Sequence, residues 1–267
     1  SGEDQGDERM SIMQQSSKAQ DRTLGVWFQA IQQGQVKLPR FQRYEAWDKW
    51  RITSFLNTII NNLPVGVTLA LDLAGDEKFI SRYIVSAEPN LQGTVTQHLL
   101  DGQQRLTAFW RGMHNNYDYE DYFIYLPQFD EREYMQSDEM QVYCQSRWTN
   151  KKGSRRPVWA DYPAKCLERG LFPLHLLCPG DKSAVVDEWI SEATQHLKPS
   201  KGDPEAFEKL ESYTALKDKL KQEINTLRER VTHFNLPYLS LPSNTPKDVA
   251  LQVFINMNTN SKPLSLY

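Results

Sequence analysis

Residues 95–113 constrain the fold more than any other part of the sequence, because a predicted strand there leads directly into a predicted amphipathic helix. Residues 95–100, VTQHLL, predict a β-strand. Asp101 and Gly102 follow at once, and glycine tolerates the tight turn that a strand needs to enter a helix. Apolar side chains then recur at helical spacing, at Leu106, Phe109, Trp110 and Met113. A strand that leads directly into a helix predicts an α/β (α+β) fold.

Helix and strand patterns alternate in the neighbouring parts of the chain. A helix is predicted from Leu24 until Gly34 ends it. Residues 36–41 read as an edge strand or a loop, because Pro39 cannot donate a hydrogen bond to a neighbouring strand. The other predicted elements are a helix over 52–60, strands over 68–73, 79–85 and 234–241, and a helix that starts at 245–248.

The composition changes between these patterns, and the change predicts the domain organisation. Residues 113–233 alternate acidic and basic stretches and include helix patterns at 183–197 and 204–231, so we expect a mainly helical insertion there. Residues 21–112 and 234–267 would form one α/β core, and the polar residues 1–20 a tail. The sequence stops just after a turn-like motif, so we expect the natural protein to continue beyond Tyr267.

Composition excludes several classes of protein. The formal net charge is -3 and the mean hydropathy -0.63, and no apolar run approaches the length of a membrane span. There is no signal peptide pattern, and three scattered cysteines are typical of a reducing compartment. We therefore expect a cytoplasmic protein that does not contact a membrane. The five histidines and three cysteines show no metal-ligand spacing, so no protein-bound metal site is predicted.

The strongest chemical signal is DGQQR at residues 101–105. Gln103, Gln104 and Arg105 fall on the first turn of the predicted helix, where unpaired amides and the helix dipole favour an anion. Arg105 adds a planar cation suited to phosphate. A glutamine can orient an attacking water and an aspartate can hold a metal ion. The alternative is a capped helix with an Asp101–Arg105 salt bridge.

Two other segments carry polar groups that could contact a ligand. LPRFQRYEAW at 38–47 combines basic, amide and aromatic residues that could stack a base and contact phosphate. Its alternative is a proline turn that buries Phe41, Tyr44 and Trp47 in the core. Asn256, Asn258 and their neighbours in the late segment could bind a ligand, although amides at a helix end are usually turn formers.

The run RWTNKKGSRR at residues 147–156 is the densest positive stretch without interleaved acids. Clustered cations gain affinity for nucleic-acid phosphates through the release of counterions. A solvated loop that balances the acidic stretch at 117–139 is an equally good interpretation. The candidate DNA-binding residues are Arg147, Lys151, Lys152, Arg155 and Arg156.

Taken together, LPRFQRYEAW, HLLDGQQRLTAFW and VFINMNTNSKPLS resemble the ParB-like N-terminal domain of the DGQQR-motif family. This family includes the nucleotide-hydrolysing half of GmrSD-type modification-dependent restriction systems and the SspE-like antiphage defence proteins. The resemblance covers residues 24–112 and 234–267. The order of the segments also matches the family, and LPVG at 63–66 fits the family's LPxG.

The resemblance implies a ParB/sulfiredoxin-like core that binds and hydrolyses GTP or ATP with Mg²⁺. The catalytic residues would be Asp101, Gln103, Gln104 and Arg105. The other nucleotide-binding residues would be Gln42, Arg43, Gly102, Thr107 and Asn258. Asn256 and Ser261 depart from the arginine and glycine that the family often has in the late segment.

The resemblance also implies a function, namely an NTPase module that couples nucleotide turnover to DNA sensing or to cleavage in a restriction or antiviral defence system. The cutting would fall to a downstream HNH-type nuclease domain, and no nuclease activity is expected from this chain alone. The alternative is a non-hydrolysing ParB-like switch that binds nucleotide or DNA. A sulfiredoxin-type redox enzyme is disfavoured, because Gln103 and Gln104 stand where that family has a cysteine.

Overall fold

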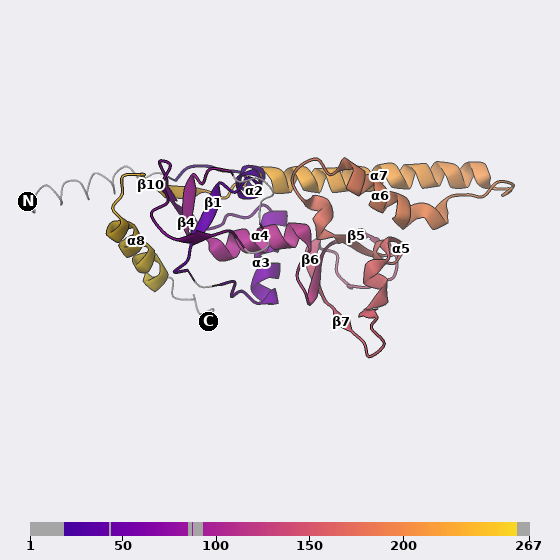
Figure 1. Ribbon diagram of the computed structural model, residues 1–267. Helices are drawn as coiled ribbons and strands as arrows, with labels where there is room; N and C mark the ends of the chain where they lie inside the picture. The colour runs from indigo at the N-terminus through magenta and orange to yellow at the C-terminus, as the bar shows by residue number, and fades with distance from the viewer. Residues whose placement is uncertain (1–18, 43, 85–86, 88–92, 261–267) are drawn as a thin grey trace, which may run out of the picture. The chain divides into compact units, whose positions relative to one another are not determined.

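The computed structural model describes residues 19–42, 44–84, 87 and 93–260, with the side chains of 259 and 260 excepted. The chain divides into two compact units (Figure 1). The first unit contains Ser1–Trp47, Pro64–Thr107 and Phe234–Tyr267, and the second contains Asp48–Leu63 and Ala108–His233. Residues 48–63, expected within the core, therefore group with the residues of the expected insertion.

A mixed five-stranded sheet organises the first unit. Its order is β10 (Tyr238–Leu241), β2 (Thr68–Asp72), β4 (Gln97–Asp101), β1 (Val36–Pro39) and β3 (Ser81–Arg82). The pairs β10–β2 and β4–β1 are parallel, whereas β2–β4 and β1–β3 are antiparallel. Together with the helices, this sheet confirms the predicted α/β fold class, while the ParB/sulfiredoxin-like topology stays a prediction.

The prediction that residues 36–41 form an edge strand or a loop was right in that residues 36–39 form a strand, but the edge position was wrong. β1 lies between β4 and β3, with Val36 opposite Gln97 on one side and Leu38 opposite Arg82 on the other. Pro39 is tolerated because it is the last residue of the strand. The two-residue strand β3 takes the edge position.

Helix α2 (Leu24–Gln32) forms where the apolar spacing predicted it and buries Leu24, Trp27, Phe28 and Ile31. The Thr23 hydroxyl caps its start, and Gly34 ends it with a φ of 72°. The indole N–H of Trp27 donates to the carbonyl of Leu236 over 2.9 Å. This bond ties the first helix to the segment that leads into β10.

Helix α8 (Lys247–Asn260) begins where the sequence predicted a capped start and packs against β4. Its Ala250 joins an apolar cluster on the sheet, made of Leu69, Leu71, Phe79, Leu100 and Leu241. The late segment therefore lies on the same sheet that carries DGQQR.

The second unit contains a three-stranded antiparallel sheet that the sequence did not predict. Its order is β6 (Gln141–Ser146), β5 (Glu120–Asp130) and β9 (Arg169–Pro173). A small ribbon follows, made of β7 (Trp148–Thr149) and β8 (Arg155–Arg156). Acidic and aromatic residues alternate irregularly along β5, so neither a strand nor a helix period stands out there.

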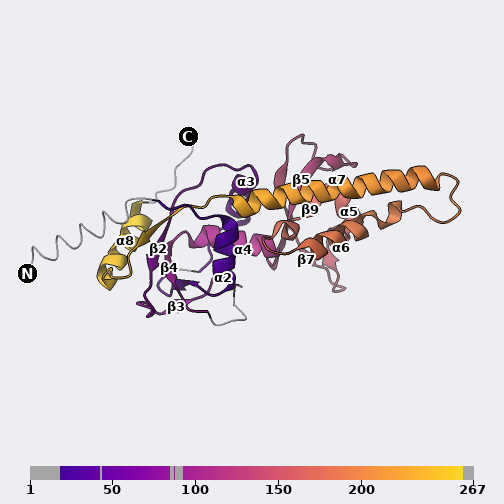
Figure 2. The same ribbon diagram turned by 90° about the horizontal axis from the view of Figure 1, so that it is seen from above.

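The predicted helices of the second unit are confirmed. α6 (Ser183–Thr194) and α7 (Ala206–His233) pack side by side (Figure 2). The remaining helices are α3 (Lys49–Ile60), α5 (Pro163–Leu167) and the short 3₁₀ turns η1 (Val158–Asp161), η2 (Leu174–Leu177) and η3 (Gln195–Leu197). Helix α4 (Gln103–His114) begins in the first unit and ends in the second. No helix in the described ranges has the length and apolar character that a membrane crossing requires.

We predict that Trp27→Ala lowers the free energy of unfolding of the first unit by about 3–5 kcal/mol, because a fully buried indole is removed. Val26→Ala, on the exposed face of the same helix, should change it by less than about 1 kcal/mol. Urea titration followed by circular dichroism measures both values. Equal losses in the two variants would show that the contact of α2 with residues 234–238 does not stabilise the unit.

Candidate functional site at the start of helix α4

The turn from β4 into α4 depends on Gly102. Its φ of 103° lies in the left-handed region, which side chains disfavour. A Cβ at this position would also lie 2.4 Å from the Cγ2 methyl of Thr68. Thr68 is itself fixed, because its hydroxyl donates to the carbonyl of Pro237. The predicted role of Gly102 as the turn between strand and helix is confirmed, and the position excludes any side chain.

Gln104 uses its amide group to hold the segment after the FQR block. Its Nε2 donates to the carbonyl of Tyr44 over 3.3 Å, and its Oε1 accepts the amide of Ala46 over 3.0 Å. The two bonds hold the loop as a neighbouring strand would. In this structure Gln104 is therefore a bracing residue for the neighbouring loop.

Arg105 holds a second loop. Its guanidinium donates to the carbonyl of Gly66 and, over 3.2 Å, to that of Val67. The Asp101 carboxylate lies 3.8 Å away, at the limit of an ion pair. Burial lowers the pKa of Arg105, and the charge of Asp101 opposes that shift. The salt bridge considered for these two residues is thus present but long, and carbonyl oxygens are the nearer partners.

Gln42 joins the FQR block to β4, the strand that leads into α4. Its side chain is buried, and its Nε2 donates to the carbonyl of Leu99 in β4. Arg43 lies outside the described residues. The aromatic residues of this block are not in the core, so the proline-turn alternative was wrong for Phe41 and Tyr44, which are 40% and 74% exposed. Trp47 is half-buried.

Gln103 and Thr107 lie one helical turn apart on α4 and are both buried, with 5% and 1% of their surfaces exposed. The Nε2 of Gln103 and the Oγ1 of Thr107 have no hydrogen-bond partner among the protein atoms. A buried polar group without a partner costs about 1–3 kcal/mol. Elsewhere in the described part of this unit, His98 Nδ1 and Thr245 Oγ1 share this condition. The pair on α4 follows directly on the motif predicted to bind phosphate.

Asn258 lies near the end of α8, where its amide donates to the carbonyl of Phe254 over 2.9 Å. Phe254 meets Phe41 edge-to-face, with ring centroids 4.8 Å apart. The late block thus contacts the FQR block through these two rings. The structure brings together the described parts of all three segments that carry the family resemblance, but Asn258 itself is exposed.

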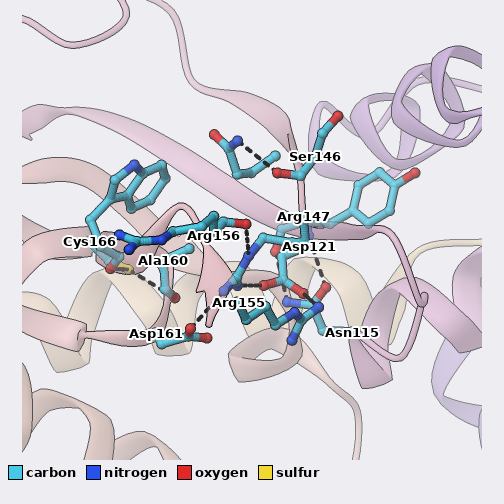
Figure 3. A network of polar contacts seen from close by, with 12 residues as sticks. Asn115, Asp121, Ser146, Arg147, Arg155, Arg156, Ala160, Asp161 and Cys166 are labelled. Carbon is cyan, nitrogen blue, oxygen red and sulfur yellow. Dashed lines mark hydrogen bonds and ion pairs between the residues drawn. The ribbon is translucent and has the colours of Figure 1, made fainter. Parts of the chain in front are cut away.

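Arg147, predicted to bind DNA, has another role in the structure (Figure 3). It is 3% exposed and donates to the carboxylates of Asp121 and Asp161 and to the carbonyl of Arg156. Burial opposes its charge, but the two carboxylates outweigh burial and raise the pKa of Arg147. An arginine held in this way is not available to a phosphate, so this candidate is corrected.

The other four residues of the basic run lie on or next to the β7–β8 ribbon, on the second unit. Lys151 and Lys152 are exposed at its tip. Arg155 has a side chain 45% exposed and lies 3.4 Å from Asp121, while Arg156 is half-buried. DGQQR belongs to the first unit, so the predicted DNA-binding and nucleotide-binding residues fall in different units.

Three contacts that build the site had no signal in the sequence. Thr68, Gly66 and Val67 meet Gly102 and Arg105 from more than thirty residues away, and only the fold reveals this. Within the described ranges, no group of three or more His, Cys, Asp or Glu side chains could hold a metal ion.

Comparison with protein families identifies a match over most of the chain. The family model described as the GmrSD restriction endonuclease, N-terminal domain, matches residues 24–267. A search of the curated proteins finds no match to the chain. The family match extends through the segment between the two resembling blocks.

We predict that Gly102→Ala destabilises the protein more than Gly75→Ala does. Both glycines have nearly the same φ, 103° and 106°, so both substitutions carry a backbone cost of about 1–2 kcal/mol. A Cβ at Gly75 meets nothing within 4 Å, whereas at Gly102 it overlaps Thr68. Thr68→Ser removes the overlapping methyl and should recover part of the loss in the double variant. Thermal unfolding of the unsubstituted protein, the two glycine variants and the double variant measures these changes in stability. Equal losses of stability in Gly102→Ala and Gly75→Ala would contradict the close contact with Thr68.

We predict that Arg147→Ala costs about 3–5 kcal/mol of stability, because it removes the closest and fully buried partner of the nearly buried Asp121 carboxylate. Arg155→Ala removes a longer and more exposed contact to the same carboxylate and should cost less than about 1 kcal/mol. Chemical denaturation of the two variants makes the comparison. A loss no larger for Arg147 than for Arg155 would argue against its anchoring role.

Proposed function

The chain belongs to the GmrSD restriction endonuclease N-terminal domain family, and we propose that the start of α4 is its nucleoside triphosphate site. The observation that carries the proposal is the pair of buried, unpartnered polar atoms, Gln103 Nε2 and Thr107 Oγ1, on the helix that DGQQR opens. A bound ligand that supplies hydrogen-bond acceptors and donors would satisfy both. GTP or ATP is the substrate class that the family resemblance implies.

The phosphates would bind at the N-terminal amides of α4. The first amides of a helix have no partner within it, and the helix dipole favours a negative charge there. Gly102 sets the tight turn that brings these amides directly after the end of β4. Arg105 adds a fixed positive charge, and because its guanidinium already holds Gly66 and Val67, it would act without changing partners.

Asp101 fits the Mg²⁺ that accompanies such a substrate. Mg²⁺ keeps most of its water and needs only one or two carboxylates beside the phosphate oxygens. The carboxylate of Asp101 ends β4 next to the helix start and remains partly exposed. When bound, the ion would neutralise charge on the phosphates. Gln103 would then orient the attacking water, because its amide is the one of the two glutamines whose Nε2 has no partner.

The nucleobase of the bound nucleotide would lie near the FQR block, residues 41–43. Tyr44 is 74% exposed and stacks with Arg82, whose guanidinium lies 4.7 Å from the ring centre. Gln104 fixes the backbone of Tyr44, so the ring is presented by the same motif that opens the phosphate site. Exposed aromatic rings beside a cation are suited to stacking a nucleobase.

Family membership makes the chain a module of a restriction or defence protein. We propose that its nucleotide turnover is coupled to DNA sensing and to cleavage by an HNH-type nuclease domain of the full-length protein, in the cytoplasm. The N-terminal domain alone would not cut DNA.

We predict that Thr107→Val weakens binding of GTP or ATP by roughly five- to tenfold, the equivalent of one neutral hydrogen bond. The hydroxyl has no partner in the protein, so the stability of the free protein should stay unchanged or rise. Isothermal titration with a non-hydrolysable analogue and thermal unfolding give the two values. Thr58→Val is the control, because its hydroxyl donates within α3 and should affect only stability.

Phosphate release from GTP and ATP separates the two proposed activities. Turnover that falls in Gln103→Ala supports hydrolysis. Nucleotide binding without turnover, with or without DNA, would favour the non-hydrolysing switch. A Thr107→Val variant that loses stability but binds nucleotide normally would show that the hydroxyl serves the fold and would contradict the site.

A further inference from the structure

We propose that the β7–β8 ribbon is a surface that contacts the phosphate backbone of double-stranded DNA. This inference rests on the DNA-sensing part of the proposed function and not on the nucleotide site. The ribbon carries Lys151 and Lys152 at its tip and Trp148 on its side, and it projects from the second unit (Figure 1).

The tip of the ribbon is held in one conformation by Asn150. Its Oδ1 accepts the backbone N–H groups of Lys152 and Ser154, over 3.0 and 2.9 Å, and its own backbone N–H donates to the Ser154 carbonyl. Gly153 completes the turn with a φ of 80°. Because the loop is already ordered, less conformational entropy is lost when it binds a partner. The exposed lysines are thus held on a fixed backbone.

The base of the ribbon is anchored by Arg147, the residue before β7 (Figure 3). It reaches the β8 carbonyl of Arg156, the β5 carboxylate of Asp121 and the η1 carboxylate of Asp161. The anchor also places a buried positive charge between the two carboxylates at the base of the ribbon. Arg147 and Arg155 together offset the two negative charges, and the exposed Lys151 and Lys152 give the tip its positive charge.

The two sides of the ribbon are different. Trp148 lies opposite Arg156, and Thr149 lies opposite Arg155, so each pair shares one face. The indole of Trp148 is 55% exposed, so its ring is accessible to a partner. An aromatic ring and a cation on one face can pack on a sugar or base edge while contacting the phosphate.

A duplex suits this surface better than a protein partner. The major groove of DNA admits a two-stranded ribbon, and phosphate contacts by lysines do not require a particular sequence. The whole chain has a net charge of -3, so it would approach DNA through a local positive surface.

The test is fluorescence anisotropy of a labelled duplex titrated with the whole chain at several salt concentrations. We expect Lys151→Ala/Lys152→Ala to weaken binding to all duplex sequences. The slope of log affinity against log salt should become shallower by about two, one unit for each lost phosphate contact. Lys198→Ala/Lys201→Ala removes the same charge from another exposed loop of the second unit and should leave the slope nearly unchanged.

Trp148→Ala should weaken binding without changing the salt slope, because it removes no charge. An unchanged slope in Lys151→Ala/Lys152→Ala, an equal change in the Lys198/Lys201 control, or binding to single-stranded DNA alone would each overturn the proposal. Absence of duplex binding by the unsubstituted chain would do the same. Nucleotide binding and basal hydrolysis, measured without DNA, should be unchanged in all three variants, so the nucleotide site is tested separately.

Discussion

The turn at Gly102 is the constraint on which the first unit depends. A left-handed residue pressed against Thr68 lets β4 pass into α4 with no intervening loop. Because the turn is this tight, the side chains of the next three residues take fixed directions. Gln103 is buried, while Gln104 and Arg105 reach two loops that are far away in the sequence. The DGQQR motif therefore has a structural role, because it connects β4, α4 and the two loops. The candidate site consists of the polar groups at the start of α4 that these contacts leave without a partner.

Much of the first unit could be predicted from the sequence because its signals are local. The apolar period of α2 and α4, the glycine at the end of α2 and the start of α8 each depend on neighbouring residues. The position of β1 could not be predicted, because strand order is set by pairing partners outside the segment. The β5–β6–β9 sheet was missed for a related reason: its strands are partly polar, and their pairing joins residues 16 to 50 positions apart.

The position of the candidate site on the strand-to-helix turn could be predicted from the sequence, but its contacts could not. DGQQR indicated a phosphate site, yet which of its side chains brace loops and which stay unpartnered depends on residues 44–46 and 66–67. The prediction that Arg147 binds DNA, which rested on the number of cations in the run, failed for the same reason. A sequence shows five cations in one run, but it does not show that two carboxylates from β5 and η1 enclose one of them. Burial separates the anchor from the cations that can bind a partner.

The fixed position of Arg105 bears on how phosphate charge would be met. Its guanidinium is largely buried and already donates to two carbonyl oxygens, so moving it onto a phosphate would leave both carbonyls without a partner. Each such loss costs about 1–3 kcal/mol, against about 1.5–3 kcal/mol for a new charged hydrogen bond. The exchange brings little net gain. In the proposed site, Arg105 would therefore act from its present position as a fixed positive charge near the helix start, while the amides of α4 would make the direct contacts with phosphate. A cation that does not move requires no reorganisation when charge develops on a phosphate, and such preorganisation is the usual source of electrostatic catalysis.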